Sequence, residues 1–431
     1  DEAHSLRNFG ATRTKRFKRY FHDNPGTALF AWSGTLTSKS LKDYAHLSNF
    51  ALKDNSPTPL HYPTVEEWAG HLDPSEFKSP PGQLVRFGEP ASAAFGKHLC
   101  ATPGVVSSGD SDNCQASLII SERKITAPES VKKLIEELKG SWQRPDGEEL
   151  IDAMAAQKCA RQLSCGFYYR WRWPRKEPTE VILRWLEARK NWHKELREKL
   201  KHSRTHMDSP KLLEVAAKRW YEGYTYVEED ENGLEKRKVQ VDPKSKNGPS
   251  PTWAAENYPE WQRVRDTAVP ETEAIWVDDF FVKDCYEWLK EDVGVLWYEF
   301  NALAQRVVQL CHSNNLPIRF ACRGPDGDDV IAKLRGTERV VASIRAHGTG
   351  KHLHMFSRAN AANPPSSGDA WEQLLGRLFR RNQEADEVSF EVYRHTESMT
   401  NAVEKARDLS EYIQGTFNAK QLLASKATWL F

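Results

Sequence analysis

Residues 371–391, WEQLLGRLFRRNQEADEVSFE, combine two patterns that predict a helix followed by a strand. Polar side chains recur at intervals of four, three and three: Gln373, Arg377, Arg380 and Gln383. Such intervals place side chains on one face of a helix, close enough to address a single ligand. The opposite side is an apolar stripe suited to docking on a sheet: Leu374, Leu375 and Leu378. Residues 388–392 then have the apolar pattern of a following strand.

An alternative interpretation of this stretch alone is a surface helix that exposes two arginines. The beginning of the chain favours a functional motif over a plain surface helix, because its first four residues are DEAH. With DEAH at one end and Q-x-x-x-R-x-x-R-x-x-Q at the other, the sequence resembles superfamily 2 helicases, most closely the Swi/Snf-like DNA translocases. Arg7 and Asn8 match the basic residue and the asparagine that commonly follow the DEAH box in that branch. The LLGR run and the ADEV tail resemble the last motif of phage or prophage helicases.

A third match follows the DEAH box. Residues 27–32, TALFAW, predict a buried strand, and Ser33, Gly34 and Thr35 come directly after it. Alone, this would be an ordinary strand-to-loop turn, but its distance from DEAH makes it resemble motif III. In the family, that motif links the nucleotide site to DNA contacts. A basic helix is predicted between the two motifs, over residues 12–22.

The resemblance implies roles in ATP hydrolysis for the residues of the DEAH box. Asp1 would hold Mg²⁺ through water, because that ion keeps much of its hydration shell. Glu2 would orient or deprotonate the attacking water. His4 would bind near the nucleotide and couple its state to the facing lobe. The implied cofactors are therefore ATP and Mg²⁺.

The resemblance also implies roles for the second half of the chain. Arg377 and Arg380 would stabilise the negative charge that develops on the phosphoryl oxygens, because the planar guanidinium group suits phosphate. The strand predicted over residues 340–344 leads into a glycine-containing loop that resembles motif V. The other residues implied to contact nucleotide come from this loop and from the last motif: Gly348, Gly350, Gln373 and Gln383.

A phosphate-binding loop is the missing part of this resemblance. Residues 348–351, GTGK, resemble its end, but His352 stands where serine or threonine is required and Arg345 stands where the leading glycine belongs. No other GxxxxGK[ST] occurs in the sequence. In the family this loop precedes DEAH, so we expect a chain that is N-terminally truncated and inactive in isolation. The alternative is a catalytically incompetent nucleic-acid-binding or partner-binding module derived from a helicase.

Composition sets wider limits on function. The 431 residues carry a formal net charge of +1, so any binding to nucleic acid would depend on local patches. The seven cysteines form no CxxC pair, which favours a reducing compartment without a disulfide framework. No run of 18 apolar residues occurs, so no membrane span is expected. The resemblance implies DNA as partner, double-stranded or at a replication fork, possible phage replication proteins, and a bacterial cytoplasm.

Between residues 53 and 272 the family motifs stop. Residues 180–202 repeat apolar side chains every three or four positions, which predicts an amphipathic helix with a basic outer face. Asn232 and Gly233 lie between two strand-like arms and predict a hairpin over residues 224–241. Residues 165–173, CGFYYRWRW, predict either a core strand whose arginines face water or a platform on which single-stranded bases stack.

We therefore expect an α/β protein in three parts. Residues 1–52 would be a remnant of the first RecA-like lobe with motifs II and III, and residues 53–272 a large, mainly helical insertion. Residues 273–431 would form a RecA-like C-terminal helicase lobe with motifs IV to VI. Within it, residues 275–289 are predicted to be a helix and residues 294–300 a buried parallel strand. The predicted function is that of an ATP-dependent DNA helicase or translocase motor.

Overall fold

The computed structural model describes residues 3–33, 37, 39–74, 78–106, 114–173, 178–202, 209–229, 235–249 and 253–431. The chain divides into two compact units. The first comprises residues 1–126 and 282–431, and the second comprises residues 127–281. This division differs from the three expected parts, in which boundaries fall after residues 52 and 272. The physical reason is that residues before 127 contribute a strand to the main sheet.

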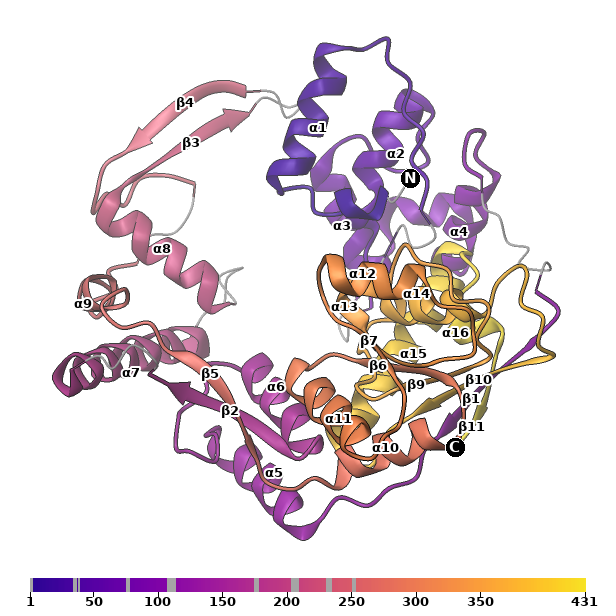
Figure 1. Cartoon of the computed structure of the whole chain (residues 1–431). Coiled ribbons are helices and arrows are strands. Elements are labelled where there is room, and N and C mark those ends of the chain that lie inside the picture. Colours follow the sequence, from indigo (N-terminus) through magenta and orange to yellow (C-terminus); the bar gives the residue numbers. More distant parts are fainter. Residues whose placement is uncertain are drawn as a thin grey trace. The chain divides into compact units, whose positions relative to one another are not determined.

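The first unit is built around a parallel sheet of seven strands in the order β11-β1-β10-β9-β6-β8-β7 (Figure 1). In that order the strands are Ala427–Leu430, Ser117–Glu122, Glu387–Val392, Arg358–Ala361, Gly294–Tyr298, Arg339–Ser343 and Arg319–Ala321. All the neighbouring strands in this sheet pair in parallel. Parallel strands need long crossover connections, which here contain helices. The expected α/β class with a RecA-like parallel sheet is therefore confirmed.

Strand β1 lies in the range expected to be an insertion. It pairs along its whole length with β10, from Ser117 opposite Glu387 to Glu122 opposite Val392. On its other side it pairs with β11. Leu118 and Ile120 point into the core, where they are 1% and 0% exposed. The motif-free sequence before residue 127 thus completes the sheet.

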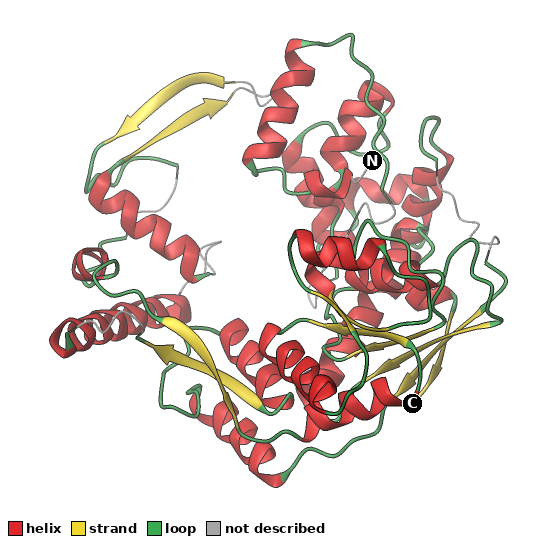
Figure 2. Ribbon diagram, in the orientation of Figure 1, coloured by secondary structure: helices red, strands yellow, loops and turns green. Residues whose placement is uncertain are grey.

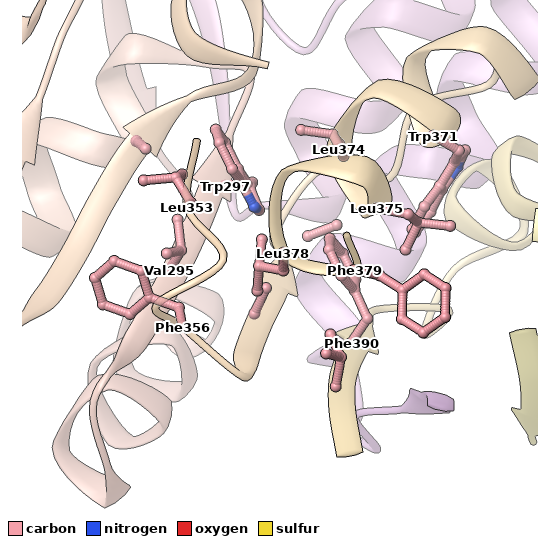
Figure 3. Close-up of a cluster of buried hydrophobic side chains, with 14 of the residues drawn as sticks. Val295, Trp297, Leu353, Phe356, Trp371, Leu374, Leu375, Leu378, Phe379 and Phe390 are labelled. Atoms are coloured by element: carbon pink, nitrogen blue, oxygen red, sulfur yellow. The ribbon is translucent and has the colours of Figure 1, made fainter. Parts of the chain in front are cut away.

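Helices cover both faces of this sheet. On one face, Val295 and Trp297 of β6 share a core with Leu374 of α14 (Gly368–Leu378), as Figure 3 shows. On the other face lies α10 (Phe280–Glu291), whose Trp288 donates its indole Nε1–H to a carboxylate oxygen of Glu391 at 2.6 Å. Alternate residues of β6 therefore face different helices, and every residue of the strand is buried. The strand predicted over residues 294–300 is confirmed.

A second core in this unit is made of helices. It joins α2 (Ala45–Leu52), α3 (Tyr62–Leu72) and α4 (Ala91–Ala101) to the C-terminal half of α15 (Glu397–Phe417). The rings of Trp68 and Phe95 meet edge to face at 5.7 Å between centroids. Val403 and Ala406 of α15 belong instead to the sheet core. One long helix therefore links the two cores of the first unit.

The second unit is mainly helical, with two antiparallel strand pairs (Figure 2). One core joins α5 (Glu129–Ser141) and α6 (Ala153–Ser164) to the pair of β2 (Phe167–Arg172) and β5 (Glu271–Trp276). The other core joins three helices: α7 (Thr179–His202), α8 (Pro210–Glu222) and α9 (Tyr258–Val264). The predicted amphipathic helix is confirmed as α7, which buries Trp185, Ala188, Trp192 and Leu196.

The predicted hairpin is confirmed as the antiparallel pair of β3 (Tyr224–Glu229) and β4 (Glu235–Val241). An ion pair joins its acidic and basic arms, with Arg237 Nε 2.6 Å from a carboxylate oxygen of Glu228. The predicted turn residues, Asn232 and Gly233, lie outside the described residues.

The aromatic strand β2 has the geometry of a core strand. Its arginines face solvent and pair across to β5, with Arg170 2.6 Å from Glu273 and Arg172 2.7 Å from Glu271. The ring of Trp171 lies edge-on to Trp185 of α7 at 6.1 Å between centroids. Because these rings pack inside the unit, the core-strand interpretation is favoured over a base-stacking platform.

Two predicted elements are wrong. Residues 27–32 form no strand, and Phe30 and Trp32 within them are 77% and 69% exposed. A strand requires a neighbour along its length, and no described strand pairs with this segment. Residues 275 and 276 end β5 instead of beginning a helix, because they pair with β2, and α10 starts only at Phe280.

Candidate functional site

Helix α14 carries only half of the predicted polar cluster. Gln373 and Arg377 lie on it, but it ends at Leu378. Arg380 and Gln383 therefore lie in the turn that follows. The expectation that all four side chains share one helical face is wrong.

The helix ends early because the next side chain enters the core. Phe379 is 5% exposed and belongs to the same cluster as Phe390 of β10 (Figure 3). Its backbone leaves the helical conformation, with φ −84° and ψ 86°. Further on, Asn382 has φ 72°, a left-handed conformation that asparagine tolerates better than most residues. Burial of one aromatic ring thus outweighs the helical spacing of the polar residues.

Arg377 is 9% exposed and binds the carbonyl groups of a neighbouring loop. Its Nε donates to the carbonyls of Gly348 at 3.2 Å and Gln373 at 3.0 Å. Its Nη1 donates to the carbonyl of Lys351 at 2.6 Å, and its Nη2 donates to Oε1 of Gln373 at 2.7 Å. In return, the carbonyl of Arg377 accepts the N–H of Leu353 at 3.0 Å. Arg377 therefore fixes residues 348–353, the motif V-like loop, against α14.

Gln383 has a similar bonding pattern. Its Nε2 donates to the carbonyls of Phe356 at 3.0 Å and Leu378 at 3.1 Å, and its Oε1 accepts the N–H of Ala385 at 3.0 Å. These bonds hold the turn after α14 against Phe356, which follows that loop in the chain. Arg377 and Gln383 thus position backbone, and Gln373 orients Arg377, which a motif on its own does not reveal.

Arg380 differs from these three residues. It is partly exposed, and its guanidinium contacts Nδ1 of His352. The positive charge of Arg380, together with partial desolvation, lowers the pKa of His352. The arginine therefore disfavours the protonated form of the neighbouring imidazole. This arrangement presents a cationic group at the surface beside the loop that Arg377 fixes.

The residues that resemble a phosphate-binding loop do not form one. Lys351, in the position of the phosphate-binding lysine, places its Nζ 3.0 Å from Asp328 of α12 (Pro325–Ala332). The residues that follow Lys351 form a loop and not the helix that such a motif requires. Gly350 has φ 72°, so it serves the turn of the loop.

At the other end of the chain, the predicted motif II and motif III residues meet. Nδ1 of His4 lies 3.1 Å from Oγ of Ser33, and the N–H of Ala3 donates to the carbonyl of Trp32 at 2.9 Å. Four other predicted site residues lie outside the described residues: Asp1, Glu2, Gly34 and Thr35.

One contact joins the two motif-bearing ends of the sequence. Nη1 of Arg7, three positions after the DEAH box, lies 2.8 Å from Oδ2 of Asp369 in the first turn of α14. Burial raises the pKa of Asp369, but hydrogen bonds from Ser367 and Arg7 outweigh it and lower that pKa. The sequence pointed to Arg7 through its motif, whereas nothing in the local sequence identified Asp369 as its partner.

A second partnership was not predictable from the motif. Glu372, adjacent to Gln373 on α14, accepts the N–H groups of Leu422 at 2.7 Å and Leu423 at 2.8 Å. These amides begin α16 (Leu422–Ser425). Burial raises the pKa of Glu372 to about 7. The motif-bearing helix is therefore tied to the segment that leads into β11.

No group of three or more histidine, cysteine, aspartate or glutamate residues within the described ranges could hold a metal ion. In the same ranges, no helix is both long enough and apolar enough to cross a membrane.

No protein-family model matches the chain, and no curated protein matches it in sequence. In structure, the chain is similar to the C-terminal part of the Fun30 ATPase domain, with 12% identity, a TM-score of 0.34, and coverage of 68% of this chain and 89% of that one. It is also similar to S. cerevisiae Dbp5 bound to RNA and ADP BeF3, with 10% identity and a TM-score of 0.26. That match covers 35% of this chain and 37% of the Dbp5 chain, so the chain spans little more than a third of that protein.

Proposed function

We propose that this chain is part of an ATP-dependent superfamily 2 helicase or translocase motor, Swi/Snf-like and of phage or prophage type, that moves on DNA. The observation that supports this most directly is the ion pair between Arg7 and Asp369. Through it, the segment that carries the DEAH box contacts the helix that carries Arg377 and leads to Arg380. Residues at opposite ends of the sequence thereby come to one region, as a nucleotide site built from both motifs requires.

In this proposal the acidic residues act on water and metal. Asp1 would hold Mg²⁺ through water, and Glu2 would orient the water that attacks the γ-phosphate. Mg²⁺ supplies charge neutralisation at the phosphates when it is bound. His4 bonds to Ser33, and this contact would relay the state of the nucleotide toward the DNA-contacting side.

The two arginines have different roles in this proposal. Arg380, partly exposed, is the residue that would contact phosphate and stabilise the developing charge. Arginine fingers of this kind contribute about 10³- to 10⁵-fold in rate, equivalent to roughly 4 to 7 kcal/mol of barrier. Arg377 is a positioning residue, because its guanidinium is occupied by the carbonyls of Gly348, Lys351 and Gln373. Gly348, Gly350, Gln373 and Gln383 would act by shaping the loop beside Arg380.

Steady-state ATP hydrolysis by the full-length protein, with and without DNA, tests this assignment. We expect Arg380→Ala to lower DNA-stimulated turnover to less than a tenth of wild type, with an unchanged circular dichroism spectrum. Arg380→Lys should restore little activity, because lysine lacks the planar fork. The matched control is Arg381→Ala, since Arg381 is the adjacent, exposed arginine and should keep wild-type turnover. Equal losses in the two alanine variants would rule out a specific role for Arg380.

A module that binds without hydrolysing ATP is the second candidate. One observation favours it: Lys351, in the position of the phosphate-binding lysine, is paired with Asp328. If the wild-type protein binds DNA but shows no hydrolysis above a no-enzyme blank, this second function holds and the motor does not. The same measurement therefore separates the two candidates.

A further inference from the structure

Helix α1 (Thr12–Asp23) concentrates positive charge in a protein whose net charge is +1. Its sequence, TRTKRFKRYFHD, contains five lysines and arginines and one acidic residue, Asp23. The basic residues exposed on it are Arg13, Lys15, Arg16 and Arg19. The functional site described above uses none of them. A local patch of this kind is what a nearly neutral protein needs to bind a polyanion.

The apolar side of α1 is fixed against the rest of the first unit. Thr14 is fully buried, and its hydroxyl donates to the carbonyl of Leu6 at 3.2 Å. Phe17 and Phe21 contact each other at 4.7 Å between ring centroids, and both contact Phe50 of α2. These contacts orient the helix, so its exposed basic residues face solvent.

Three basic residues of this face, Arg13, Lys15 and Arg16, have no acidic partner in the part of the chain that the structure describes. No carboxylate of the described residues lies within ion-pair distance of Arg13, Lys15 or Arg16. Elsewhere, exposed arginines are commonly paired, as Arg170 is with Glu273 and Arg237 is with Glu228. Three unpaired cations on one short helix repel one another, which disfavours the patch unless an anion occupies it.

The spacing of the exposed side chains suits a phosphate backbone. Arg13, Arg16 and Tyr20 lie at i, i+3 and i+7, and therefore along one ridge of the helix. Residues three apart on a helix have Cβ atoms about 5 to 6 Å apart. Arginine forks bind phosphate oxygens, and Tyr20, which is 54% exposed, offers an aromatic face on which a base could stack.

Other polyanions fit this face less well. Helices that lie on membranes insert apolar side chains into the lipid, whereas the phenylalanines of α1 are already packed against α2. An acidic peptide would satisfy the arginines but would make no use of the exposed tyrosine ring. A nucleic acid uses both features.

We propose that the exposed face of α1 is a sequence-independent nucleic-acid-binding surface, with Arg13 and Arg16 on phosphates and Tyr20 stacking on a base of single strands. The choice of nucleic acid as ligand rests on the function proposed above, but the surface does not depend on ATP hydrolysis. It would add a contact on the DEAH-bearing side of the first unit, separate from Arg380 and the loop at residues 348–353.

Fluorescence anisotropy with labelled single-stranded and duplex DNA, at several salt concentrations, tests the surface in the full-length protein. We expect Arg13→Glu/Arg16→Glu to weaken binding of both DNAs by about tenfold or more at moderate salt. Each lost phosphate contact should reduce the slope of log K against log salt by about one, so the double variant should lose about two. The matched control is Lys97→Glu/Lys158→Glu, which changes net charge equally at two exposed lysines outside α1. It should bind within about twofold of wild type.

A second variant tests the aromatic contact without changing charge. Tyr20→Ala should weaken binding of single-stranded DNA by about fivefold or more, because base stacking on one aromatic ring contributes that much. Binding of duplex DNA should stay unchanged. Equal effects on both DNAs would contradict a stacking role for Tyr20.

The outcomes separate this surface from the proposed motor. If the double arginine variant bound DNA with wild-type affinity, the proposed binding surface on α1 would be wrong, whereas the proposed motor function would be unaffected. If the double arginine variant lost binding to anionic phospholipid vesicles but still bound DNA, the face would be assigned to membranes instead. Failure of the wild-type protein to bind either DNA would overturn both proposals.

Discussion

Two apolar segments of this protein look alike in sequence and differ completely in structure. Residues 294–298, GVLWY, form β6, which pairs with β8 on one side and β9 on the other. Residues 27–32, TALFAW, pair with no described strand. Trp297 of the first segment is 0% exposed, whereas Trp32 of the second is 69% exposed. An apolar run becomes a buried strand only where the chain supplies neighbours for both edges and both faces.

The largest expected effect follows from this pair of tryptophans. Trp297→Ala removes a side chain that is packed against α14 in the sheet core, and we expect it to lower the free energy of unfolding by about 3 to 5 kcal/mol. Trp32→Ala removes an exposed ring, and the expected loss is below about 0.5 kcal/mol. Urea unfolding followed by far-ultraviolet circular dichroism measures both changes. Similar losses in the two variants would mean that residues 27–32 are packed as tightly as β6.

The next effect concerns helix α14, which packs on β6. The buried carboxyl of Glu372 has a pKa of about 7, above its ordinary value of 4.5. The folded protein therefore holds this proton more tightly than the unfolded chain does, so the contribution of Glu372 to stability is fully present below about pH 4.5 and is lost as the pH rises through about 7. The fall from this one group should be about 2 to 3 kcal/mol.

Glu372→Gln should remove that fall, because the amide cannot ionise, while its single oxygen can still accept one of the two N–H groups that the carboxyl binds. Thermal melts of both proteins between pH 4.5 and 7.5 give the difference, with Glu411→Gln, an exposed carboxylate on α15, as matched control. If wild type and Glu372→Gln change in parallel with pH, the carboxyl is ionised throughout and the raised pKa is wrong.

The smallest effect concerns the ion pair between the segment that precedes residues 27–32 and the helix α14 that packs on β6. The ion pair of Arg7 and Asp369 is partly buried, with side-chain exposures of 16% and 23%, and should contribute about 1 kcal/mol of coupling. A double-mutant cycle of Arg7→Ala and Asp369→Asn measures it through the free energy of unfolding. Since the pKa of Asp369 is lowered on folding, the contribution is present above about pH 4 and is lost as the pH falls through the folded value. If the losses of unfolding free energy in the two single variants add up to the loss in the double variant at neutral pH, Arg7 and Asp369 are not coupled.

The sequence predicted the elements whose patterns depend on local chemistry. The stripe of Leu374, Leu375 and Leu378 is fully buried as predicted, and the hairpin forms where its two arms oppose charge. The α/β class followed from the alternation of helices and apolar runs. Such features are visible because burial and turn formation act on neighbours in the chain.

The rest depended on partners that are distant in sequence. Nothing in SLIISE, residues 117–122, shows that its neighbours in the sheet come from residues 387–392 and 427–430. Arg377 matched a motif for phosphate contact, yet the carbonyls around it come from a loop whose conformation the sequence did not predict. Likewise, the helical spacing of Arg380 was overridden by the burial of Phe379. Long-range packing decides each of these cases.

The position of β1 in the sheet has a consequence for biosynthesis. Its flanking strands, β10 and β11, leave the ribosome only after the whole of residues 127–281 has been made. The continuous second unit can therefore fold during translation. Strand β1, in contrast, has no neighbouring strands to pair with until β10 and β11 have been synthesised. Transient contacts with helices, or a chaperone, could protect this segment until then. We expect the efficiency of that protection to affect the yield of the native protein more than the stability of the finished sheet does.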